Sequence, residues 1–221
     1  MNTLAQGGAI GAQLHWIPSN RGLTSDRMTA GLIGGGGTSH LETFTAAHQR
    51  LFWGAHWQVW NQGAPDRRIW RVHYSTVKAD ATPPGDRTDA ERVAERLRGA
   101  LVELRDFSRC HQRCEPFTVY FERALDALTS GHRSGYHQDL APAGILSEAE
   151  ARILDACQSA HVFGAMGSWN DLSFEEPVQT EYERISDRAF ETIHASIAAA
   201  VNGWAGRRWG QTGVRPGSDR T

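Results

Sequence analysis

Four segments in the second half of the chain carry apolar residues at helical spacing, and this pattern restricts the possible folds most strongly. Apolar residues recur at intervals of three and four, which places them along one side of a helix. Such a stripe must be covered in a folded protein, so we expect the four helices to pack on one another. The stripes consist of Val93, Leu97, Leu101 and Leu104; Phe117, Phe121, Leu125 and Leu128; Ile153, Leu154, Cys157 and Ala160; and Val178, Tyr182, Ile185, Ala189, Ile193, Ile197 and Val201.

The boundaries of these helices are also marked in the sequence. Thr88 and Ser147 each stand three residues before a glutamate, the spacing of a capping box at a helix start. Pro116 fits the first helical position, where no amide proton is needed. Gly131 and Gly203 indicate where the second and the fourth helix end.

The first half of the chain gives a mixed signal. Ser39 and Glu42 form another capping box, which predicts a helix over residues 39–54. Residues 57–60 and 69–74 then alternate apolar and polar side chains around a turn at 63–67, which predicts a β hairpin. The alternative is a helix that continues to residue 61. On such a helix His40, His48 and His56 fan apart, so we do not expect them to share a metal ion.

Together these patterns predict a mainly α fold, a compact bundle of about four to five helices with a small N-terminal antiparallel β hairpin. An α+β fold is the alternative. We expect an irregular glycine-rich segment over residues 1–38, a single globular domain over 39–203 and a flexible basic tail over 204–221. A division near Pro83 and Pro84, where the composition is typical of a linker, is the alternative to a single domain.

Composition excludes several classes of protein. The formal net charge is −2, so no overall positive field attracts nucleic acid. No run approaches the roughly 20 apolar residues of a membrane helix, and the N-terminus lacks the pattern of a signal peptide. Three cysteines are too few for a disulfide framework. We therefore expect a soluble cytoplasmic protein that contacts neither nucleic acid nor a membrane.

Catalytic and metal-binding signals are weak. The chain has no G-x-S-x-G, H-E-x-x-H or C-x-x-C motif and no P-loop lysine. Cys110 and Cys114 are the best metal candidates, but no second pair of ligands completes a zinc site, and we expect no metal or other cofactor. A polar loop carries His132, His137 and Asp139, which form a possible acid–base group.

Binding candidates come from two stretches. Trp169, Asn170 and Asp171 follow two glycines and precede the last helix, so they form a constrained corner. Trp57 and Trp60 belong to a tryptophan-rich stretch that is suited to a ligand or partner surface. For each stretch the competing interpretation is structural, because tryptophans usually lie in the core of a domain of this size.

These observations favour a binding or protein-interaction module, adaptor- or inhibitor-like, over an enzyme. We expect its partner to be another protein or a small ligand. The alternative is a hydrolase or metal-assisted enzyme that uses the histidine and aspartate loop, with or without the two cysteines. A contiguous exposed aromatic patch would favour the binding module, and convergence of the loop side chains in a cleft would favour the enzyme.

Overall fold

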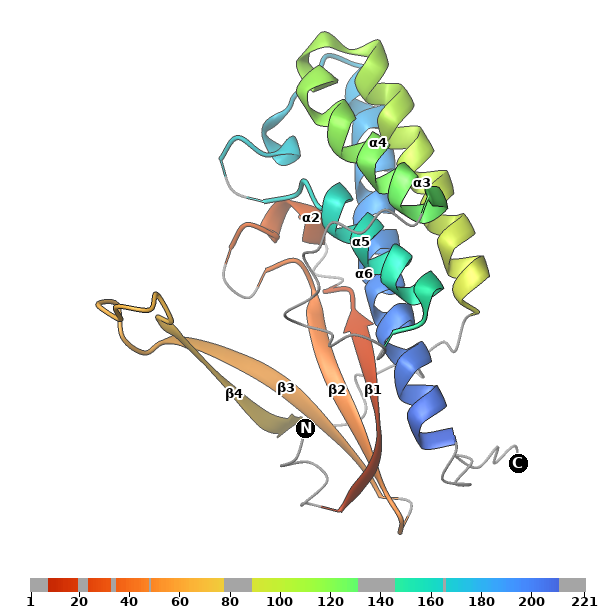
Figure 1. Cartoon of the computed structure of the whole chain (residues 1–221). Coiled ribbons are helices and arrows are strands. Elements are labelled where there is room, and N and C mark those ends of the chain that lie inside the picture. The colour runs from red at the N-terminus through yellow and green to blue at the C-terminus, as the bar shows by residue number, and fades with distance from the viewer. Residues whose placement is uncertain are drawn as a thin grey trace.

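The four predicted helices form a bundle in the second half of the chain (Figure 1). The computed structural model describes residues 8–19, 24–32, 35–47, 49–77, 89–130, 146–164 and 166–210. The helices are α3 (Ala90–Cys110), α4 (Glu115–Ser130), α5 (Glu148–Ala160) and α6 (Val178–Gly210), with short 3₁₀ turns η2 (Gln112–Cys114) and η3 (Trp169–Asp171). The predicted number and positions of these helices are confirmed.

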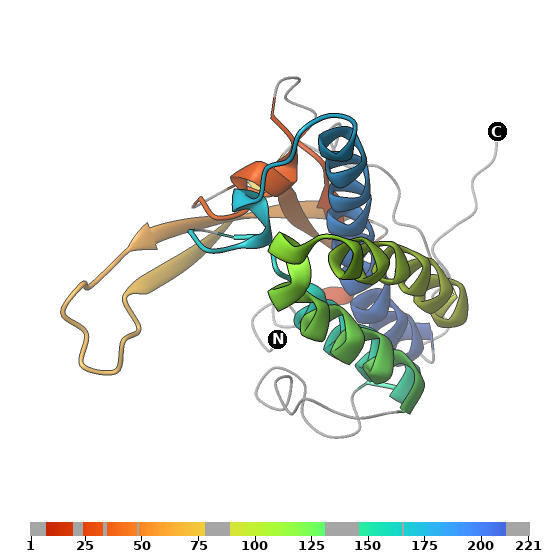
Figure 2. The same cartoon turned by 90° about the horizontal axis from the view of Figure 1, so that it is seen from above.

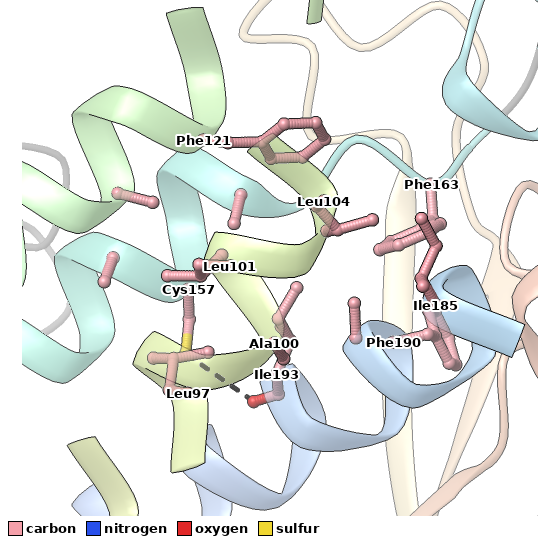
Figure 3. Close-up of a cluster of buried hydrophobic side chains, with 14 of the residues drawn as sticks. Leu97, Ala100, Leu101, Leu104, Phe121, Cys157, Phe163, Ile185, Phe190 and Ile193 are labelled. Atoms are coloured by element: carbon pink, nitrogen blue, oxygen red, sulfur yellow. Dashed lines mark hydrogen bonds between the residues drawn. The ribbon is translucent and has the colours of Figure 1, made fainter. Parts of the chain in front are cut away.

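The apolar stripes meet in one core, as predicted. Leu97, Leu101 and Leu104 of α3 are fully buried, and they lie beside Phe121 and Ile193 from neighbouring helices (Figure 3). The capping box at the start of α5 is present, with both of its reciprocal hydrogen bonds between Ser147 and Glu150. Helix α3 begins one residue later than predicted, with Asp89 as its N-cap.

The first half of the chain forms a four-stranded antiparallel sheet in the order β1-β2-β3-β4. Its strands are β1 (Ala9–Ile17), β2 (Thr38–Thr45), β3 (Arg50–Val59) and β4 (Trp70–Val77), and the short helix α2 (Asp26–Thr29) lies between β1 and β2. The described chain therefore mixes α and β structure, and the predicted hairpin is the outer half of a larger sheet. The predicted antiparallel pairing of residues 57–60 with 69–74 is confirmed.

The predicted helix over residues 39–54 is wrong, since this segment contains β2 and the first half of β3. Glu42 accepts hydrogen bonds from His15 and Arg50 instead of capping a helix. The β2 sequence TSHLETFT also alternates between two faces and contains three β-branched threonines, which favour a strand. A four-residue capping pattern was therefore weaker evidence than the alternation over eight residues.

Strand β1 lies in the segment 1–38 that we expected to be irregular. Its sequence AIGAQLHWI contains alanine and glycine, which have low strand propensity, so the local signal is poor. The strand is held from both sides, by β2 and by α6. The side chain of Asn202 on α6 accepts from the amide of Leu14 at 2.7 Å and donates to its carbonyl at 2.8 Å. The outer edge of β1 is thus partly satisfied by α6.

Helix α6 continues past Asn202 to Gly210, beyond the stop that we predicted at Gly203. The predicted division of the chain into a segment, a domain and a tail stays a prediction. Within the described ranges, no helix has the length and apolar character needed to span a membrane.

Candidate functional site

The two faces of the β3–β4 ribbon, residues 50–77, differ in chemistry. Alternation along paired antiparallel strands assigns each side chain to one face. The aromatic face carries no charged residue and consists of Leu51, Trp53, Ala55, Trp57, Val59, Trp70, Val72, Tyr74 and Thr76. The polar face carries Arg50, Phe52, Gly54, His56, Gln58, Arg71, His73, Ser75 and Val77.

The aromatic face continues the side of the sheet that the helices cover at β1. Register places Trp16 of β1 on this face, and its ring packs against Phe190 and His194 of α6. Toward β4 the cover ends, because the ribbon projects away from the bundle (Figures 1 and 2). Trp57 and Tyr74 are consequently 56% and 60% exposed. A contiguous apolar surface of this kind marks an interaction site on many proteins.

The predicted binding residue Trp60 is also exposed, but it belongs to the other side of the ribbon. The guanidinium carbon of Arg71 lies 3.1 Å from the centroid of the Trp60 ring. Next to them, Gln58 and His73 are hydrogen-bonded at 2.9 Å, as are His56 and Ser75. The side chains of the polar face are therefore neutral or basic, and they contact one another.

Strand β4 is the outermost strand of the sheet that the described residues form. In the described part of the chain, β3 is the only element that packs extensively against it. Edge strands are commonly protected by proline, lysine or a bulge, and β4 contains neither proline nor lysine. Among the described residues its outward amides and carbonyls thus remain available for hydrogen bonding, in contrast to the edge of β1, where α6 supplies Asn202.

At the base of the sheet, Glu42 anchors a buried polar group. Its carboxylate lies 2.8 Å from Nε2 of His15 and also pairs with Arg50. Burial raises the pKa of Glu42, but the hydrogen bonds from His15 and Arg50 outweigh burial, so the pKa is lowered overall. The carboxylate therefore stays ionised in the fold. Because Glu42 and His15 are almost completely buried, we assign this group a structural role.

A ring cluster joins the sheet to the bundle and makes stability dependent on pH. The rings of His194 and Trp16 stack at 5.2 Å, and His161 lies 5.6 Å from His194. Burial is the main cause that lowers the pKa of His194 to about 4, the nearby His161 acts in the same direction, and Asp26 opposes them. The unfolded chain takes up this proton near pH 6.5, whereas the folded chain does not until near pH 4. The contribution of neutral His194 to the free energy of unfolding is therefore fully present above pH 6.5 and is lost as the pH falls from 6.5 to 4.

We predict that His194→Phe reduces this loss. The variant keeps the ring stack and removes Nε2, a buried atom with no hydrogen-bond partner. Between pH 7 and pH 4.5 the natural protein should lose about 2 kcal/mol more unfolding free energy than the variant. Urea titrations at both pH values measure this difference. An equal loss of unfolding free energy in the two proteins would contradict the assignment of this pH dependence to His194.

Two of the three residues in the predicted corner at 169–171 are buried. Trp169 is fully buried, and its Nε1 donates to Oγ of Ser186 at 2.7 Å. Asn170 is also buried and bonds the backbone and side chain of Arg27. Asp171 is exposed, but its carboxylate accepts from backbone amides of the preceding turn. These contacts are internal to the fold, and ligand binding by the three residues stays a prediction.

A shallow cavity of about 440 Å³ is lined in part by residues 161–168, which precede this corner. His161 and Ser168 lie on one side of the cavity, and Tyr120 and Arg123 of α4 lie on the other. Most of these side chains are exposed, and the cavity shows no convergent catalytic group. We therefore regard the ribbon as the better candidate site.

The remaining predicted candidates do not form a site in the described residues. Cys110 is exposed, whereas Cys114 is buried and burial raises its pKa to about 12. No group of three or more histidine, cysteine, aspartate or glutamate side chains within the described ranges is arranged to hold a metal ion. His132, His137 and Asp139 lie outside the described residues, so the hydrolase hypothesis stays a prediction.

Comparisons with protein-family models, with curated proteins and with solved structures find no significant match to this chain. The function is therefore inferred from the geometry of the ribbon.

Proposed function

We propose that the protein is an interaction module that binds an extended segment of another protein along the edge of β4. The observation that carries this proposal is the combination of a free strand edge with a charge-free aromatic face. Strand addition uses both features, since the backbone of the edge supplies affinity and the adjoining face supplies specificity. The uncovered aromatic side chains lie on the two strands nearest to that edge.

The chemistry of β4 specifies the partner segment. Trp70, Val72 and Tyr74 point to the aromatic face, so the neighbouring residues of an added strand should be apolar. Arg71 points to the polar face, where an acidic residue is a favourable neighbour. The ribbon as a whole carries four arginines against one aspartate. The fitting partner is thus an extended segment in which apolar and acidic residues alternate.

A synthetic peptide tests this proposal directly. The probe is an eight-residue peptide in which glutamate alternates with valine or phenylalanine, and its binding to the full chain is measured by fluorescence anisotropy. A second peptide of the same sequence carries N-methyl groups on alternate amides, which cannot donate ladder hydrogen bonds. Each lost bond is worth about 1 kcal/mol, so we expect the methylated peptide to bind at least about tenfold more weakly. Equal affinities would contradict strand addition.

Two neighbouring residues of β4 provide a matched control. Tyr74→Ser removes an exposed aromatic ring from the aromatic face and should weaken binding about tenfold. Ser75→Ala changes the adjacent residue on the polar face and should leave the affinity within about twofold. Both positions are exposed, so both variants should fold normally. If the two variants bind equally well, the aromatic face is not the contact surface.

A further inference from the structure

Every histidine of the four strands lies on the same face of the sheet. Register pairs His15 of β1 with His40 of β2, and His56 of β3 with His73 of β4. His40 is opposite Gly54, two residues before His56 on the same face. On a helix His40 and His56 would fan apart, but on strands alternate residues lie on one face, so both lie on the same side of the sheet.

The outer pair, His56 and His73, differs from the inner pair in its surroundings. His15 is buried and its Nε2 lies 2.8 Å from the carboxylate of Glu42, so this ring is already engaged. His56 and His73 are both exposed on the projecting ribbon. Side chains that lie directly opposite on antiparallel strands have Cβ atoms about 4.5–5.5 Å apart. Two imidazoles at this separation can both reach one ion.

Each ring of the pair is hydrogen-bonded to a different uncharged neighbour, and both rings must leave these neighbours and turn toward each other to share an ion. An amide NH₂ group can only donate, so Nε2 of His73 accepts the 2.9 Å bond from Gln58 and carries no proton. Nε2 of His56 contacts the hydroxyl of Ser75, an exposed and uncharged neighbour. The closest cation on this face, Arg71, is directed onto the ring of Trp60. Neither histidine is therefore paired with a charged group in these contacts.

We propose that His56 and His73 form a two-histidine site for a divalent transition-metal ion, with water completing the coordination. Neutral imidazole suits Zn²⁺, Cu²⁺ and Ni²⁺. Two protein ligands are fewer than the three or four of catalytic and structural zinc sites, so binding is exchangeable, with a Kd on the order of 10 µM for Zn²⁺. The ion links β3 to β4 on the face opposite the aromatic residues. This inference is independent of the proposed peptide binding.

Isothermal titration of the purified full chain with Zn²⁺ tests the site. We expect one ion per chain, and we expect His56→Gln and His73→Gln each to weaken binding at least about tenfold. His111→Gln is the matched control, because this histidine lies outside the sheet, and it should bind like the natural protein. Zinc binding that is unchanged in both ribbon variants, or absent up to about 1 mM Zn²⁺ in the natural protein, would overturn the proposal.

A variant that moves one histidine to the other face tests whether binding requires two opposed rings or only two histidines on the ribbon. Val72→His combined with His73→Gln keeps the histidine count but moves one ring to the aromatic face. We expect this double variant to bind Zn²⁺ as weakly as His73→Gln alone. Circular dichroism confirms that each variant is folded. Recovery of natural affinity in the double variant would contradict a site formed by His56 and His73.

Discussion

Replacing Trp169 by alanine is expected to lower the free energy of unfolding by about 3–5 kcal/mol, the largest effect of any single change considered. The side chain is fully buried and packs edge-on against Phe117 and Phe121, with ring centroids 5.4 and 5.3 Å away. Its indole also donates to Ser186, and the hydroxyl of Tyr182 donates to its carbonyl. Truncation leaves a cavity where η3, α4 and α6 meet.

Chemical denaturation of the full chain measures this effect, and Trp57→Ala is its matched control. Trp57 lies on the exposed aromatic face, so its loss should change the unfolding free energy by no more than about 0.5 kcal/mol. The same substitution, tryptophan to alanine, should thus have a large effect on the unfolding free energy in the core and a small effect on the surface. Similar destabilisation by both variants would mean that the ribbon is packed against other parts of the chain.

Replacing Arg27 by leucine is expected to cost about 2–3 kcal/mol, because a buried guanidinium joins α2 to the bundle. Nε donates to Asp187 at 2.9 Å and one terminal nitrogen donates to Asn170 at 3.1 Å. The guanidinium also lies 5.3 Å from the ring centroid of Tyr182. Leucine retains apolar bulk but leaves Asn170 without this donor. Asp187 is partly exposed, so water offsets part of the cost.

Arg27→Lys should recover little of this loss, since one ammonium group cannot reproduce the two directed donors of a guanidinium. The control is Arg184→Ala on the surface of α6, where Arg184 pairs with Glu181 and Glu103. Exposed ion pairs contribute little, so we expect this variant to unfold almost like the natural protein. Thermal unfolding of the three variants gives the comparison. Full recovery by lysine would show that charge alone, without the fork geometry, fixes α2.

The bundle was predictable because each helix carries its own complete signal. The stripe of α3 and the capping box at Ser147 depend only on residues within one helix. The sheet was less accessible, because the stability of β1 comes from β2 and from Asn202, which is 188 residues away from Leu14. No local pattern contains that contact. The same limit applies to Glu42. Its spacing from Ser39 fits a helix cap, although the residue lies in a strand.

The candidate site was predictable only in part. The sequence identified Trp57 and Trp60 as possible surface residues and gave the same status to Trp169, which is buried. Composition does not distinguish these tryptophans, because exposure depends on where the helices stop covering the sheet. The alternation over residues 69–74 predicted a strand but did not show that its aromatic face is uncovered. Its free edge became apparent only from the strand order.

The most direct test of the central claim is amide hydrogen exchange on the full chain, with and without the alternating acidic peptide. Strand addition predicts that saturating peptide slows exchange at alternate amides of β4, those that point away from β3. The amides of β1 should be unaffected, because α6 lies along that strand. Peptide binding that leaves the exchange of every β4 amide unchanged would contradict the account.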